Sequence, residues 1–108
     1  MAELRYYVTA DGESVFESWF SDLNAQAAAK ITVALARLEH GNLSNAKPVG
    51  GGVIEFRIDW GPGYRIYFGR DGDQVVILLT GGTKQRQQRD ISAAKDAWKD
   101  YQRRKRLQ

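Results

Sequence analysis

Five side chains in the second half of the chain are suited to cleaving an RNA phosphodiester: Glu55, Arg57, Arg65, Tyr67 and Lys84. Attack by a 2′-hydroxyl needs a base for the nucleophile, cations for the pentacoordinate phosphorane and an acid for the leaving 5′-oxygen. Arginine offers two parallel donors to phosphate oxygens and keeps its charge throughout. A lysine whose pKa is lowered by neighbouring arginines can act as acid or base, and a tyrosine can stack on a nucleobase.

The spacing of these residues predicts that they share one face of a sheet. Residues 53–58 and 64–68 alternate apolar with charged or polar side chains, which indicates two strands joined by a turn. If the apolar sets of both strands face the core, the open face carries Glu55, Arg57, Arg65 and Tyr67. Glycines at positions 81 and 82 then allow a tight turn that brings Lys84 and Arg86 back toward this face.

A simpler interpretation of the same pattern is a solvated face. Alternating arginine and glutamate on neighbouring strands often form cross-strand ion pairs with no chemical role. In that case Glu55 only neutralises Arg57 or Arg65, and Tyr67 packs at the rim. Composition and pattern alone therefore leave both interpretations open.

The elements that position these residues are predicted from periodicity and turn signals. Ser14 followed by Glu17 is a capping box, and apolar residues then recur at helical spacing up to Leu23. The pattern predicts strands over residues 5–9, 53–58, 64–68 and 74–79, a second helix over residues 26–40, and a final helix capped by Asp90. We therefore expect an α+β fold of order β-α-α-β-β-β-α, with a helical hairpin packed on a small antiparallel sheet and all the helices on one side of that sheet.

Composition narrows the classes of function. The 108 residues fit one domain, residues 1–108, with a net charge of +3. Residues 84–108 contain nine Lys and Arg and three Asp, so this segment has a charge of +6. Such a charge attracts a polyanion or an acidic partner. With no cysteine and one histidine, a disulfide scaffold and a zinc site are not expected. We expect a cytoplasmic protein with no cofactor, no metal and no membrane segment.

Three segments together resemble a known family. Residues 47–59 and 61–68, then Gly81-Gly82-Thr83-Lys84, then residues 87–91 resemble the addiction-module killer proteins. These are the phage Gp49-like and HigB-like toxins of the RelE/ParE superfamily. The similarity extends over nearly the whole chain, including the first helix and the basic C-terminal helix.

The resemblance implies the toxin of a bacterial type II toxin–antitoxin pair. RelE-like members cut mRNA on the ribosome without a metal, and a cognate antitoxin, usually of the helix-turn-helix type for HigB-like toxins, neutralises them. The family's phosphate-stabilising arginine matches Arg65, its basic residue on the preceding strand matches Arg57, and its lysine after the last strand matches Lys84. The candidate RNA-binding residues are Lys47, Tyr67, Arg86 and Arg89.

The sequence departs from the family pattern at the proton-transfer groups. Where relatives have a tyrosine this chain has Ile91, and it has no histidine near the C-terminus. Our hypothesis is that Lys84 acts as acid and Glu55 as base, while Arg57 and Arg65 stabilise the phosphorane. Two other functions stay open: a ParE-like toxin that binds DNA gyrase and cleaves nothing, and a non-catalytic RNA-binding module.

Overall fold

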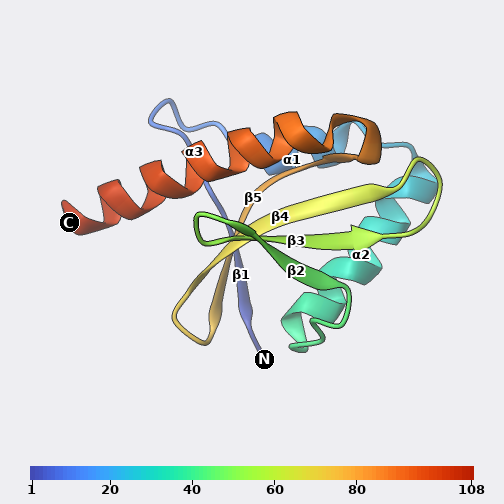
Figure 1. Ribbon diagram of the computed structural model, residues 1–108, viewed down its shortest axis with the longest axis horizontal. Helices are drawn as coiled ribbons and strands as arrows, with labels where there is room; N and C mark the ends of the chain where they lie inside the picture. Colours follow the sequence, from blue (N-terminus) through green and yellow to red (C-terminus); the bar gives the residue numbers. More distant parts are fainter.

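The computed structural model describes residues 1–108 as a five-stranded sheet with three α-helices (Figure 1). In chain order the elements are β1 (Glu3–Tyr6), α1 (Val15–Ser21), α2 (Ala25–Glu39), β2 (Ala46–Gly50), β3 (Val53–Ile58), β4 (Tyr64–Asp71), β5 (Val75–Thr83) and α3 (Gln87–Arg106), with a 3₁₀ turn at Lys84–Arg86. The strands lie in the order β1-β5-β4-β3-β2. The predicted α+β class and the helical hairpin on a sheet are confirmed.

Local signals explain where the hairpin helices begin. The Ser14 hydroxyl accepts a hydrogen bond from the Glu17 amide at the start of α1, and the Asn24 side chain does the same for Ala27 at the start of α2. Each cap satisfies a backbone donor that the first turn would leave unpaired. The apolar faces of both helices, including Phe16, Ile31 and Leu38, pack on one side of β3, β4 and β5.

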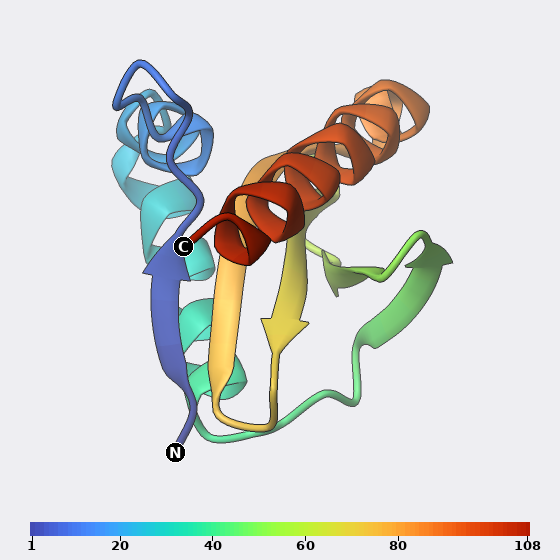
Figure 2. The same cartoon turned by 90° about the vertical axis from the view of Figure 1, so that its left-hand side faces the viewer.

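The other side of the sheet is covered by α3. The expectation that all the helices lie on one side is therefore wrong. Figure 2 shows α3 and the α1–α2 hairpin on different sides of the strands. Ala94 and Trp98 of α3 form a second core with Val53, Tyr67, Ile77 and Leu79 from the sheet. Truncating a buried aromatic such as Trp98 to alanine typically costs about 3–5 kcal/mol, so this second core is a substantial part of the fold.

Two further features differ from the expected sheet. β2 was not predicted, because Pro48 and the glycines around it are typical of a loop; Pro48 is tolerated here since β2 is an edge strand. The element order is therefore β-α-α-β-β-β-β-α. The sheet is also mixed: β1 runs parallel to β5, while the other pairs are antiparallel.

Close approach between helices and strands requires glycine at two positions. A Cβ at Gly69 would overlap the Trp98 ring of α3, and a Cβ at Gly81 would overlap the Trp19 ring of α1. These glycines lie on opposite faces of the sheet and let each helix sit close to the strands. None of the three helices combines the length and the apolar character needed to cross a membrane.

Candidate functional site

The register of the strands places the predicted site residues in two columns on the face that α3 covers. Glu55 pairs with Lys47 on β2 and with Tyr67 on β4. In the next column Arg57 pairs with Arg65. Alternation in the sequence therefore predicts correctly that these side chains share a face. It does not predict the start of α3, which lies over part of both columns.

Glu55 lies inside the protein and not on an open face. Its side chain is fully buried, with 0% exposure. Oε2 accepts hydrogen bonds from the Tyr67 hydroxyl at 3.0 Å and from the Gln87 side-chain amide at 2.8 Å, while Oε1 has no hydrogen-bond partner. The Lys47 ammonium is 4.0 Å from Oε1. This placement does not support the expected role of Glu55 as a base for a bound RNA, because the carboxylate does not reach the surface.

Arg65 is 3% exposed and is held mainly by its own strand. Its Nη1 donates to the carbonyls of Gly63 at 3.1 Å and Tyr64 at 3.4 Å. Its Nε is 3.8 Å from Glu55 Oε1, which is an ion-pair distance but too long for a hydrogen bond. Nε therefore stays unpaired, and Nη2 makes no hydrogen bond within the chain. The guanidinium retains donors for an incoming acceptor.

Tyr67 is buried, so it cannot stack on a nucleobase, which is the role expected from the sequence. Burial raises the pKa of its hydroxyl far above the usual range, and the nearby charges of Glu55 and Asp90 raise it further. Tyr67 therefore stays protonated and acts as a fixed hydrogen-bond donor to Glu55.

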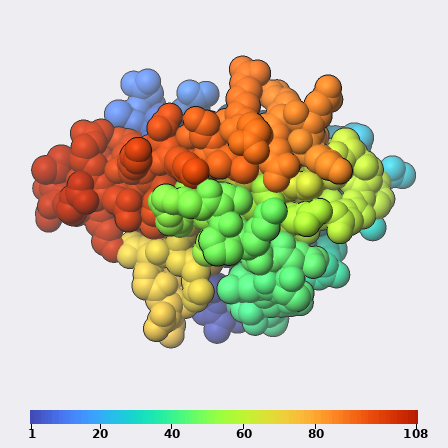
Figure 3. All heavy atoms as spheres, in the orientation of Figure 1, coloured from blue at the N-terminus to red at the C-terminus, as the bar shows by residue number.

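The exposed cations of the predicted site surround this buried cluster. Arg57, Lys84, Arg86 and Arg89 are exposed and form no ion pair within the chain. The backbone amide of Lys84 donates to the Gly63 carbonyl at 2.7 Å, which fixes the start of the 3₁₀ turn beside the β3–β4 turn. Residues 84–89 line one open depression, and Figure 3 shows this orange segment projecting from the surface.

Sequence reasoning missed the position of Asp90. We expected it to cap the last helix, but α3 begins at Gln87, so Asp90 lies within the first turn. Its Oδ2 is buried without a hydrogen-bond partner, and a Cβ at Gly82 would overlap this atom. Burial raises the pKa of Asp90, against the opposing effect of Arg86 and Arg89. In the sequence, only the glycine at position 82, which pairs with Arg65, indicated that another side chain could approach the sheet here.

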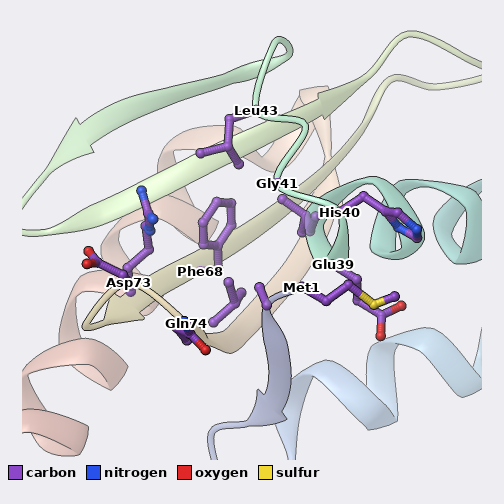
Figure 4. Close-up of a pocket in the computed structure, with 12 residues that line it drawn as sticks. Met1, Glu39, His40, Gly41, Leu43, Phe68, Asp73 and Gln74 are labelled. Atoms are coloured by element: carbon purple, nitrogen blue, oxygen red, sulfur yellow. The ribbon is translucent and has the colours of Figure 1, made fainter.

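A separate pocket lies on the face that carries the helical hairpin. Its lining includes Met1, His40, Leu43, Phe68 and Gln74 (Figure 4), and none of the predicted site residues contributes to it. His40 accordingly lies apart from the cation cluster. No group of three or more His, Asp or Glu side chains is arranged to hold a metal ion.

Comparison with known proteins gives the family. The family model for phage-derived Gp49-like proteins (DUF891) matches residues 18–102. The chain belongs to this family. All of the predicted site residues, and Asp90, lie within the matched segment. The Gp49-like family is toxin-like and related to RelE/ParE proteins, so the resemblance seen in the sequence is supported at this level.

This chain is also similar to a bacterial protein. An uncharacterised protein of Haemophilus influenzae is 47% identical over 81 residues, which cover 74% of this chain and 82% of the relative. A toxin-like family implies an antitoxin as partner.

Proposed function

We propose that this protein is a HigB-like toxin of a bacterial type II toxin–antitoxin pair. In this proposal residues 1–108 act in the cytoplasm as one toxin domain, a metal-independent mRNA endonuclease that works on translating ribosomes and inhibits translation. The toxin-like Gp49-like family supports the general class. The site geometry is the support for acting on RNA.

The observation that carries the proposal is the set of unpaired cations around Arg65. Arg57 lies directly opposite Arg65 on the neighbouring strand, and Lys84 starts the turn that is hydrogen-bonded to Gly63. A carboxylate partner partly neutralises a cation, whereas several exposed cations with no such partner attract phosphates. A single-stranded RNA crossing the end of the sheet would place successive phosphates near Arg57, Lys84 and Arg86.

The side chains divide into surface and buried roles. In this proposal the cations at the surface bind phosphates: Lys47, Arg57, Lys84, Arg86 and Arg89. Arg65 offers its unpaired nitrogens to the scissile phosphate once RNA displaces the side chains over it. Glu55 takes a positioning role in place of the base role inferred from the sequence, because its Oε2 holds Tyr67 and Gln87.

The partner in this proposal is a cognate antitoxin of the helix-turn-helix type, which binds and neutralises the toxin. Toxicity and antitoxin binding can be measured separately. A variant that loses toxicity but still binds the antitoxin is correctly folded. This separation gives the test of the proposed function a control for correct folding.

The test is growth arrest by the double variant Arg57→Ala/Lys84→Ala. We expect loss of arrest with antitoxin binding retained, because both side chains are exposed and unpaired. Arg37→Ala is the matched control, since Arg37 is an exposed cation on α2, on the opposite side of the sheet. Full toxicity of the double variant, or equal loss in the control, would show that this cation cluster is not the site.

One observation favours a toxin that binds without cleaving. The two carboxylates of the buried cluster, Glu55 and Asp90, are buried and partly buried, so neither is a fully exposed base. A ParE-like gyrase inhibitor would give DNA damage and an SOS response with intact mRNA. A non-catalytic RNA-binding module would leave RNA intact and lose affinity steeply with salt, by a slope of about −0.7 per phosphate contact on a logarithmic plot.

A further inference from the structure

All the buried side-chain nitrogen and oxygen atoms that lack a hydrogen-bond partner lie in one place. They are Glu55 Oε1, Arg65 Nε and Asp90 Oδ2. Buried polar atoms are nearly always paired, because an unpaired one costs free energy. Glu55 and Arg65 are also at least nine-tenths buried, with 0% and 3% exposure. Three such atoms between the sheet and the start of α3 indicate a site built for something other than stability.

Asp90 is the member of this group that reaches toward the surface. Its residue is partly exposed, whereas its Oδ2 points to the backbone of Gly82. Gly82 pairs with Arg65 in the sheet, so the carboxyl lies over the strand position opposite the arginine. The absence of a side chain at position 82 is what allows this approach. Asp90 thus joins the buried cluster to the exposed cations.

The surroundings of Asp90 make it a weaker acid than an aspartate in water. Burial raises its pKa, and the charges of Arg86 and Arg89 on the same segment only partly oppose this. From the sheet, the buried Tyr67 hydroxyl, the Glu55 carboxylate and the Arg65 guanidinium face the same space. A carboxylic acid with a raised pKa transfers protons more effectively near neutral pH than an ordinary one, which is almost fully ionised there.

We propose that Asp90 is the general acid of the cleavage reaction, an inference that rests on the proposed endonuclease function. The 2′-oxygen forms a bond to phosphorus, and its proton passes to a water molecule. The bond from phosphorus to the 5′-oxygen breaks, and the Asp90 proton moves to that 5′-oxygen. The products are a 2′,3′-cyclic phosphate and a free 5′-hydroxyl, and solvent reprotonates Asp90. Lys84 then serves as a cation for the phosphate and not as the acid.

The decisive experiment compares two substrates on ribosomes programmed with mRNA. One is ordinary RNA, and the other carries sulfur in place of the leaving 5′-oxygen at the cleavage site. A thiolate leaves without protonation, so the second substrate needs no acid. For Asp90→Asn we expect cleavage of ordinary RNA to fall about 100-fold or more, and cleavage of the sulfur substrate to stay within about tenfold of the native protein.

Matched variants separate the roles. Asp96→Asn changes an exposed carboxylate further along α3 and should leave both rates unchanged. Lys84→Met should slow both substrates, because a lost phosphate contact is not rescued by a better leaving group. The native rate should fall as pH rises through the pKa of Asp90, and Asp90→Asn should lack this fall. Folding of each variant is checked by circular dichroism and antitoxin binding.

The outcomes distinguish this inference from the proposed function. If the native protein leaves RNA intact, the endonuclease function is wrong and the role of Asp90 falls with it. If the native protein cleaves and Asp90→Asn cleaves equally well, only the role of Asp90 is overturned. Equal loss on both substrates by Asp90→Asn also overturns it, because that result indicates a structural role.

Discussion

Glu55 is the centre of the buried polar cluster beneath α3. One of its oxygens holds the Tyr67 hydroxyl and the Gln87 amide, and the other faces Arg65 and Lys47 at ion-pair distances of 3.8 Å and 4.0 Å. A carboxylate with no exposure is tolerated only when such partners offset its lost hydration. These contacts tie β3, β4 and the start of α3 together, with the Arg65 guanidinium at ion-pair distance.

Replacing Tyr67 by phenylalanine tests this cluster at the level of one atom. The change removes the hydroxyl that donates to Glu55 and leaves the ring in place. We expect Tyr67→Phe to lower the free energy of unfolding by about 1–3 kcal/mol, because a buried charged acceptor loses a donor. Urea unfolding measures this, with the slope against denaturant unchanged.

The control for that variant is Tyr6→Phe. Tyr6 is 46% exposed and its hydroxyl makes no hydrogen bond within the chain, so its loss should change stability by less than about 0.5 kcal/mol. An equal effect of the two variants would mean that the Tyr67–Glu55 bond contributes nothing specific.

At the scale of elements, α3 is anchored to the sheet by polar contacts as well as by its apolar face. The Tyr101 hydroxyl donates to Asp71 at 2.6 Å, and the Lys105 ammonium is 2.5 Å from the same carboxylate. The Tyr7 hydroxyl donates to Asp100 at 2.6 Å. Together these contacts hold the second half of α3 against β4 and the N-terminal segment.

The Tyr101–Asp71 contact predicts a loss of stability at high pH. Burial and the hydrogen bond to Asp71 raise the pKa of Tyr101 to about 12, above the usual value of 10.0. The folded state therefore holds this proton more tightly than the unfolded state. The stabilisation is complete below about pH 10 and is lost as pH rises toward about 12.

Thermal unfolding across this range measures the effect. We expect Tyr101→Phe to have a smaller fall in melting temperature between pH 10 and 12 than the native protein, with Tyr6→Phe retaining the native fall. Identical falls in all three proteins would contradict the assigned contact.

Local patterns predict most elements but not their exact limits. The Ser14 cap and β3 agree with the sequence prediction, because both depend on neighbouring residues. The start of α3 differs: Gln87 begins the helix after a 3₁₀ turn, and no side chain caps it. Its position is set instead by tertiary contacts such as Gln87 with Glu55, which no local pattern contains.

At the scale of the whole molecule, alternation predicts which side chains share a face but not what covers it. Residues 74–79 are apolar on both faces, which is the one sequence signal that both sides of the sheet are buried. The apolar positions Ala94 and Trp98 on α3 needed a partner surface, and the face containing Tyr67 provides it. Glu55, Arg65 and Tyr67 are therefore buried, while Arg57 remains exposed.

In the structure, the basic residues of the C-terminal segment include both paired and unpaired cations. Arg103, Arg104 and Lys105 pair with Asp100 or Asp71 and stabilise α3. Lys84, Arg86 and Arg89 pair with no carboxylate, and Lys84 lies beside Gly63 and the Arg65 side chain. The start of α3 therefore carries three cations that no carboxylate of the chain neutralises, whereas three of the four cations at Arg103–Arg106 are paired.

We propose that the cations around Arg65 belong to a nuclease that acts on translated mRNA. Sequencing of RNA 5′ ends shortly after induction of the native protein tests it most directly, with the Arg57→Ala/Lys84→Ala variant as control. We expect new 5′ ends that are confined to translated reading frames and absent in the double variant. Intact mRNA during growth arrest by the native protein would contradict it.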